Sequence, residues 1–148
     1  MQCPKLIVLS RNEMRGFRGS EPYVVISIRS PGDRILHLRP DALRLARINL
    51  DFWDTTPAWE AQLGVPAEAM TSAQAERIAA FVTKYADRAT IVIHCLAGVS
   101  RSAGVAAGIS AACEGDDAAF LSSRHEPNPH VRDLVMLAMR QLQGGARS

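Results

Sequence analysis

The chain has 148 residues, a formal net charge of +2 and 47% hydrophobic residues, few of which are aromatic. This length predicts one domain rather than two, with a core built mainly from Val, Ile, Leu and Ala. The small net charge predicts neither a nucleic-acid nor a membrane partner, and it is compatible with a small anionic substrate.

The N-terminal segment and the cysteines favour a cytoplasmic protein. The only apolar run near the start is Leu6–Leu9, which is shorter than a secretory signal or a membrane span requires. The three cysteines, Cys3, Cys95 and Cys113, lie far apart and form no C-x-x-C pair of the kind that binds zinc. Free thiols in a reducing compartment are therefore expected.

Short runs rich in β-branched residues predict buried strands. In chain order these are Lys5–Leu9, Tyr23–Ile28, Ile48–Phe52 and Thr90–His94, with Ile35–Leu38 as a weaker candidate. The basic segment Arg11–Arg18 is predicted to be a flexible, solvated surface, with a place at the border of the substrate pocket as the alternative. The stretch Asp51–Met70 contains Pro57, Gly64 and Pro66 and is predicted to be a long loop, a feature that is often functional in compact domains.

Helices are predicted between and after the strands. A capping box at Thr71–Gln74 precedes apolar residues at helical spacing. A small-residue helix is predicted from Arg101 to about Cys113, and another from Pro129. Strands that alternate with helices indicate an α/β domain with a largely parallel central sheet. We expect residues 1–143 to form a single domain and residues 144–148 to form a flexible tail.

The segment IVIHCLAGVSRS, residues 91–102, carries the strongest chemical signal. A predicted strand ends at Cys95, the chain turns, and a helix begins at Arg101. The backbone N–H groups of such a turn, with the unpaired N–H groups and positive dipole end of the helix, form a site for a tetrahedral oxyanion. Gly98 permits a positive φ in the turn, and the Arg101 guanidinium can bind two oxygens at once.

The donors of this turn surround the Cys95 sulfur and favour its thiolate, the nucleophilic form. Because a more stable thiolate is also a weaker nucleophile, activation of the sulfur brings little net gain. We therefore expect the turn and Arg101 to act mainly by holding phosphoryl oxygens in line and by stabilising charge in the transition state.

The nonamer HCLAGVSRS, residues 94–102, matches the H-C-x-x-G-x-x-R-S signature of the protein tyrosine phosphatase superfamily. The late position of this loop in a short chain resembles the small dual-specificity-like members. The resemblance implies their fold, a three-layer α/β domain with a central, mostly parallel sheet flanked by helices. It implies a single phosphatase domain over residues 1–143 that requires no metal and no cofactor.

The resemblance also implies a role for each residue of the signature. Cys95 would form a phosphocysteine intermediate, and Ser102 would donate a hydrogen bond that helps the sulfur leave. His94 would brace the loop by hydrogen bonding to its backbone rather than act as a base. The phosphate would be bound by the loop amides and a guanidinium, from Leu96, Ala97, Gly98, Val99, Ser100 and Arg101.

The resemblance implies a general acid as well, because the family uses an Asp on a mobile upstream loop. Two candidates, Asp51 and Asp54, follow a predicted strand, and no W-P-D motif decides between them. If Leu50 and Phe52 point into the core, Asp51 points outward as part of the strand. Asp54 lies just past the strand end, where it could cover the pocket. We favour Asp54 and keep Asp51 as the alternative.

The segment Glu126–His130 resembles the P-N that opens the last helix of dual-specificity phosphatases. Under that interpretation, Asn128 supports the signature loop. An Asn before a Pro at the first helical position is also a common helix cap. The sequence leaves both interpretations open, and they are compatible with each other.

The predicted function is hydrolysis of phosphomonoesters, in the first place phosphotyrosine in proteins and also phosphoserine and phosphothreonine. One alternative is a phosphate-binding pseudoenzyme without turnover. Another is an inositol-phosphate phosphatase, which the loop disfavours because the five residues before Arg101 include no cation for extra phosphates. The expected partners are phosphorylated proteins or small phosphomonoesters, and the sequence does not indicate an oligomeric state.

Overall fold

A computed structural model of the chain describes residues 3–64, 68–115, 117–120 and 124–145. Its centre is a four-stranded sheet in the order β1-β4-β2-β3, in which every neighbouring pair is parallel. The strands are β1 (Leu6–Ser10), β2 (Tyr23–Arg29), β3 (Arg44–Asp51) and β4 (Thr90–Cys95). The α/β class with a parallel central sheet is therefore confirmed.

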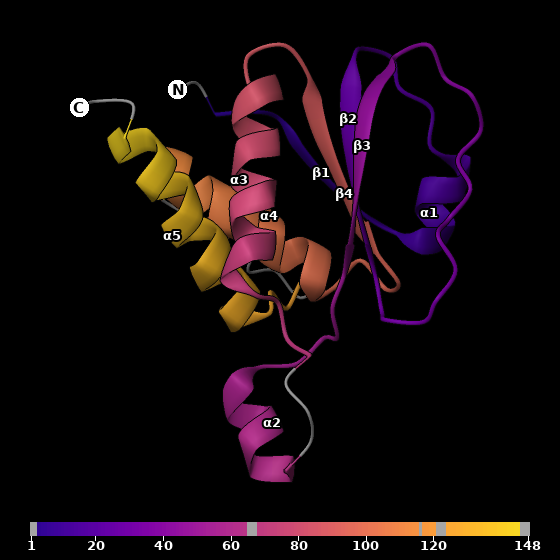
Figure 1. The fold of residues 1–148 in the computed structure, drawn as a ribbon. Coiled ribbons are helices and arrows are strands. Elements are labelled where there is room, and N and C mark those ends of the chain that lie inside the picture. The colour runs from indigo at the N-terminus through magenta and orange to yellow at the C-terminus, as the bar shows by residue number, and fades with distance from the viewer. Residues whose placement is uncertain (1–2, 65–67, 116, 121–123, 146–148) are drawn as a thin grey trace.

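Helices cover both faces of the sheet (Figure 1). Three of them, α3 (Ser72–Tyr85), α4 (Arg101–Glu114) and α5 (Pro129–Gly145), pack on one face and share its apolar core. The short helix α1 (Arg11–Gly16) lies on the other face, where Met14 joins a smaller apolar cluster. Helix α2 (Pro57–Leu63) extends from the loop that follows β3. No helix in the described part of the chain is long and apolar enough to span a bilayer.

The central strands β2 and β4 are buried on both faces, as their unbroken apolar runs predict for a parallel sheet. Close packing of α4 on α5 depends on small residues of α4. A Cβ on Gly108 would lie 2.7 Å from the Arg132 carbonyl oxygen, and one on Gly104 would lie 3.0 Å from the Asn128 carbonyl oxygen. This packing holds the start of α5 beside the start of α4, at the carboxyl edge of the sheet.

Several local predictions were wrong. The basic segment Arg11–Arg18 is not irregular, because Ser10 and Glu13 form a capping box that starts α1. The predicted loop Asp51–Met70 contains α2, which has Thr56 as its N-cap, Pro57 at the first turn and Gly64 in the left-handed conformation after its end. Both sets of signals are present in the sequence.

Three other predictions also differ from the structure: one predicted strand is not formed, and two elements have other limits. Ile35–Leu38 is not a strand, and Ile35 is 51% exposed in the connection between β2 and β3. Strand β3 begins at Arg44 rather than Ile48, because its first half is a partly exposed edge with polar residues. Helix α5 includes residues 144 and 145 of the predicted tail, and residues 146–148 lie outside the described residues.

Candidate active site

The signature loop connects the end of β4 to the start of α4. Cys95 is the last residue of β4 and Arg101 is the first of α4, with residues 96–100 forming the turn. Gly98 has φ +70°, and a Cβ at this position would lie 2.6 Å from the Ser10 backbone nitrogen. Glycine is therefore required here for its conformation and for the close approach of the turn to the end of β1.

The Cys95 side chain is buried and its sulfur faces into the turn. The backbone N–H of Gly98 donates a hydrogen bond to Sγ at 3.3 Å, and the Ser102 Oγ lies 3.0 Å from the same sulfur. Cys95 is only 2% exposed. The arrangement places a thiol at the floor of a turn beside a backbone donor and a hydroxyl.

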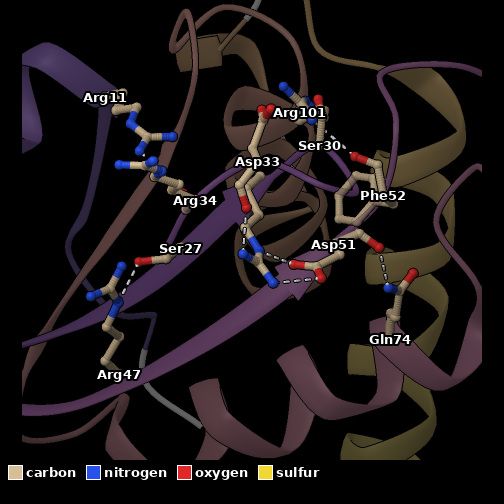
Figure 2. Close-up of polar contacts among 11 residues, drawn as sticks. Arg11, Ser27, Ser30, Asp33, Arg34, Arg47, Asp51, Phe52, Gln74 and Arg101 are labelled. Carbon is tan, nitrogen blue, oxygen red and sulfur yellow. Dashed lines mark hydrogen bonds and ion pairs between the residues drawn. The ribbon is translucent and has the colours of Figure 1, made fainter. Parts of the chain in front are cut away.

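Arg101 is fixed by one nitrogen and leaves others available. Its Nη1 donates to the Ser30 Oγ at 3.0 Å and to the Phe52 carbonyl oxygen at 2.9 Å (Figure 2). Within the described residues, its Nε and Nη2 donate to no protein acceptor. A cation at a helix N-terminus is unfavourable unless it serves an anion. The buried guanidinium is thus held in place with donors free for an oxyanion.

Asp54 lies against the last residue of the turn. Its Oδ1 accepts a hydrogen bond from the Ser100 hydroxyl at 2.7 Å and another from the Asn128 side-chain amide at 3.0 Å. Both contacts hold one oxygen of the carboxyl group. In the described part of the chain, no protein donor contacts Oδ2.

Asp51 has a different environment. Its carboxylate forms a bidentate ion pair with Arg29, with distances of 2.6 Å from Nε and 2.9 Å from Nη2. Its backbone carbonyl accepts from the Gln74 side chain (Figure 2). The two aspartates are therefore separated as strand alternation predicts: Asp51 points to a neighbouring strand, whereas Asp54 contacts the signature loop.

Asn128 combines the two arrangements that the sequence left open. Its Oδ1 accepts hydrogen bonds from the backbone N–H groups of His130 at 3.0 Å and Val131 at 3.2 Å, as a helix cap does. Its amide nitrogen donates to Asp54 and also to the Thr55 carbonyl oxygen, both at 3.0 Å. One side chain thus connects the start of α5 to the loop that carries Asp54.

His94 makes a contact that the sequence did not suggest. Its ring does not bond to the loop backbone, and its Nε2 lies 2.7 Å from the Ser27 Oγ on the neighbouring strand β2. Burial, together with the charges of Arg47 and Arg11, lowers the pKa of His94 from 6.5 to about 4. The imidazole is therefore neutral at physiological pH.

No family model and no curated protein matches the sequence. Human DUSP28 has a TM-score of 0.62 over 97% of this chain and 96% of its own, with 16% identity. The structure of PTPMT1 in complex with PI(5)P has a TM-score of 0.58 over 96% of this chain and 94% of its own, with 18% identity. A mouse dual-specificity phosphatase complexed with zinc tungstate has a TM-score of 0.57 over 86% and 75% of the two chains, with 18% identity.

The chain has the dual-specificity phosphatase fold. At these sequence identities the similarity concerns the fold, and it extends over nearly the whole chain. It confirms the architecture that the signature nonamer implied.

Sequence reasoning missed the residues that hold the signature residues from other strands. Ser30 and the Phe52 carbonyl position Arg101, and Ser27 contacts His94. Ser30 precedes a Pro-Gly pair, so the sequence suggests only an ordinary turn residue at this position. A contact through a backbone carbonyl leaves no signal in the sequence. Of the predicted site residues, the structure gathers Cys95, Arg101 and Ser102 with Asp54 and Asn128, and it leaves Asp51 apart.

Proposed function

We propose that the protein hydrolyses phosphomonoesters through a phosphocysteine intermediate, with phosphotyrosine in proteins as the preferred substrate. The observation that supports this most strongly is the position of the Cys95 sulfur, which faces the Gly98 N–H and the Ser102 hydroxyl at the floor of the turn. The similarity of fold to cysteine phosphatases agrees with it.

In the first step the Cys95 thiolate attacks phosphorus, and the bond between phosphorus and the tyrosine oxygen breaks. The loop amides and the free nitrogens of Arg101 bind the remaining phosphoryl oxygens and stabilise their charge. Asp54, through the Oδ2 that no described protein donor contacts, gives its proton to the leaving phenolate.

In the second step a water molecule attacks the phosphocysteine, and the sulfur–phosphorus bond breaks. Asp54, now a carboxylate, takes the proton from the attacking water. Ser102 donates a hydrogen bond to the departing sulfur, whose Sγ lies 3.0 Å from the Ser102 Oγ. Inorganic phosphate leaves, and the thiolate is restored.

The test compares two aspartate variants on aryl phosphates that differ in the basicity of the leaving group. A poor leaving group needs protonation more than p-nitrophenolate does. Asp54→Asn is expected to slow hydrolysis of phenyl phosphate roughly 100-fold or more, within the usual contribution of a general acid, and to affect p-nitrophenyl phosphate much less. Asp51→Asn is the matched control, because Asp51 lies on the same segment and pairs with Arg29.

If Asp51→Asn shows the leaving-group dependence and Asp54→Asn does not, the assignment of the acid is wrong. A wild-type protein that is inert toward every activated aryl phosphate, yet binds phosphate, would be the phosphate-binding pseudoenzyme instead. The lack of a cation in residues 96–100 continues to disfavour an inositol polyphosphate in the pocket formed by the signature loop.

A further inference from the structure

A second recess lies beside the signature loop, on the sheet face that α1 covers. Its walls come from the start of α1, the ends of β2 and β4, part of β3 and the connection between β2 and β3. The apolar cluster on this face reaches the recess at Leu36, but the strand residues that line the recess on this face are polar, among them Ser27, Arg47 and His94. The proposed chemistry uses none of these three side chains.

The lining of the recess carries more positive charge than the nearby carboxylates neutralise. Four arginines line it, Arg11, Arg29, Arg34 and Arg47, against one acid, Asp33. Arg29 is neutralised by Asp51. Among the described residues, no carboxylate forms an ion pair with any of the other three. The Arg11 and Arg34 side chains lie near each other in Figure 2, and Arg11 donates to the Arg34 carbonyl oxygen at 3.1 Å.

Arg47 is the cation whose position is hardest to explain without a ligand. Its Nε donates to the Ser27 Oγ at 2.8 Å, but its Nη2 is buried and has no hydrogen-bond partner in the described part of the chain. Burial lowers the pKa of Arg47, and the charges of Arg44 and Arg11 add to this effect. A second buried and unpartnered atom, the His94 Nδ1, belongs to the same wall. An unpaired buried donor such as the Arg47 Nη2 is costly, and an anion in the recess would offset the charge of this guanidinium.

The recess borders the candidate active site through two residues, Ser30 and Leu96. Ser30 lines the recess, and its hydroxyl accepts the hydrogen bond from Arg101. Leu96, the residue after Cys95, lines the recess on its other side, and its carbonyl accepts from the Arg11 backbone at 3.2 Å. A substrate bound over the signature loop would therefore extend directly past these cations.

The lining also contains exposed apolar groups, because Ile35 is 51% exposed and Leu96 is 62% exposed. A peptide carries apolar side chains that could cover such groups, whereas the ring of an inositol phosphate carries only hydroxyl and phosphate groups. We propose that the recess is a subsite for an acidic side chain of a protein substrate, near in sequence to its phosphotyrosine. This rests on the proposed function and adds a preference for acidic phosphopeptides to it.

The test is a binding titration with Cys95→Ser protein, which needs no turnover. Three fluorescent phosphotyrosine peptides are compared: one with Ala around the phosphotyrosine, one with Glu on its N-terminal side and one with Glu on its C-terminal side. One Glu peptide is expected to bind roughly five- to tenfold more tightly than the Ala peptide, the size of one charge-assisted contact in a partly exposed site. This advantage is expected to shrink as salt is raised.

Two arginine variants in the same background locate the effect. Arg34→Gln is expected to reduce the ratio of Glu-peptide to Ala-peptide affinity to near one. Arg39→Gln is the matched control, because Arg39 is an exposed arginine of the same connection that lines a different recess. It should leave the ratio unchanged.

Equal binding of the three peptides, or a preference that survives Arg34→Gln, would overturn the subsite. Tighter binding of an inositol bisphosphate than of either Glu peptide would also overturn it, in favour of a polyphosphate ligand. Hydrolysis of p-nitrophenyl phosphate by the wild-type protein tests the proposed function alone, because this small substrate carries no side chain to reach the recess. The two proposals can therefore fail separately.

Discussion

Replacing Gly98 by Ala tests whether the shape of the signature loop produces the site. At φ +70° a residue with a Cβ costs about 1–2 kcal/mol. The added methyl group would also meet backbone atoms at the end of β1, at 2.6 Å from the Ser10 nitrogen and 2.7 Å from the Leu9 carbonyl carbon. Backbone cannot rotate away as a flexible side chain does, so overpacking adds about 1–3 kcal/mol.

We therefore expect Gly98→Ala to reduce the free energy of unfolding by about 2–5 kcal/mol, the sum of these two contributions. Gly64→Ala is the control, because Gly64 has φ +68° and nothing within 4 Å of its Cβ position. It should lose only the conformational part, about 1–2 kcal/mol. Urea unfolding followed by circular dichroism measures both values.

The same substitution should impair catalysis. A loop displaced from β1 moves the Gly98 N–H away from the Cys95 sulfur, a contact of 3.3 Å. Loss of one hydrogen bond to a charged group corresponds to roughly a 10- to 100-fold decrease in kcat/KM on p-nitrophenyl phosphate. Gly64→Ala should retain wild-type activity. Equal stability and equal activity of the two variants would show that the close approach of Gly98 to β1 does not shape the loop.

Three further predictions concern other residues of the site. The folded-state pKa of His94, about 4, lies below the ordinary value of 6.5, so its contribution to stability is present above pH 6.5 and is lost as pH falls toward 4. The wild type should lose about 2–3 kcal/mol of unfolding free energy between pH 7 and 4.5 from this group, and His94→Gln should lack that component in urea unfolding; equal pH profiles would contradict the assignment. Asn128→Ala should cost about 1 kcal/mol of stability through the lost helix cap, and it should also reduce kcat. Asn128→Ser should keep most of the cap and reduce kcat alone, because a Ser hydroxyl accepts from the helix N–H groups but is too short to hold Asp54. Arg101→Lys should lose most phosphate affinity and turnover, because an ammonium cannot reproduce a guanidinium that is anchored by one nitrogen and open at the others. A phosphate affinity of the variant equal to that of the wild type, measured by calorimetry, would contradict this expectation.

The arrangement of the signature loop could be predicted from the sequence because its residues are contiguous. Cys95, Gly98, Arg101 and Ser102 lie within one strand–turn–helix unit, whose geometry follows from local rules. The choice of Asp54 over Asp51 also followed from a local rule, the alternation of side chains along a strand. In the structure, Asp51 pairs with Arg29 and Asp54 contacts Ser100.

The contacts that cross between strands could not be predicted in this way. Ser30 reaches Arg101 only because β2 lies beside β4 in the sheet, and a single sequence does not specify that order. The arginine-lined recess has the same origin, since α1, β3 and the connection after β2 each supply one arginine that forms no ion pair within the described part of the chain. Helices α1 and α2 were missed for a different reason. Their capping residues are present in the sequence, but the basic charge of the first segment and the prolines of the second favoured irregular structure in the prediction.

The proposed mechanism requires that the Cys95 sulfur becomes bonded to phosphorus during turnover. The direct measurement is mass spectrometry of the Ser102→Ala protein, quenched in acid during hydrolysis of p-nitrophenyl phosphate, since the loss of the Ser102 hydroxyl is expected to slow the second step. We expect one added phosphoryl group on the peptide that contains Cys95, and none in the Cys95→Ser,Ser102→Ala double variant. Turnover with no phosphoryl group on that peptide, or with the group on another residue, would contradict it.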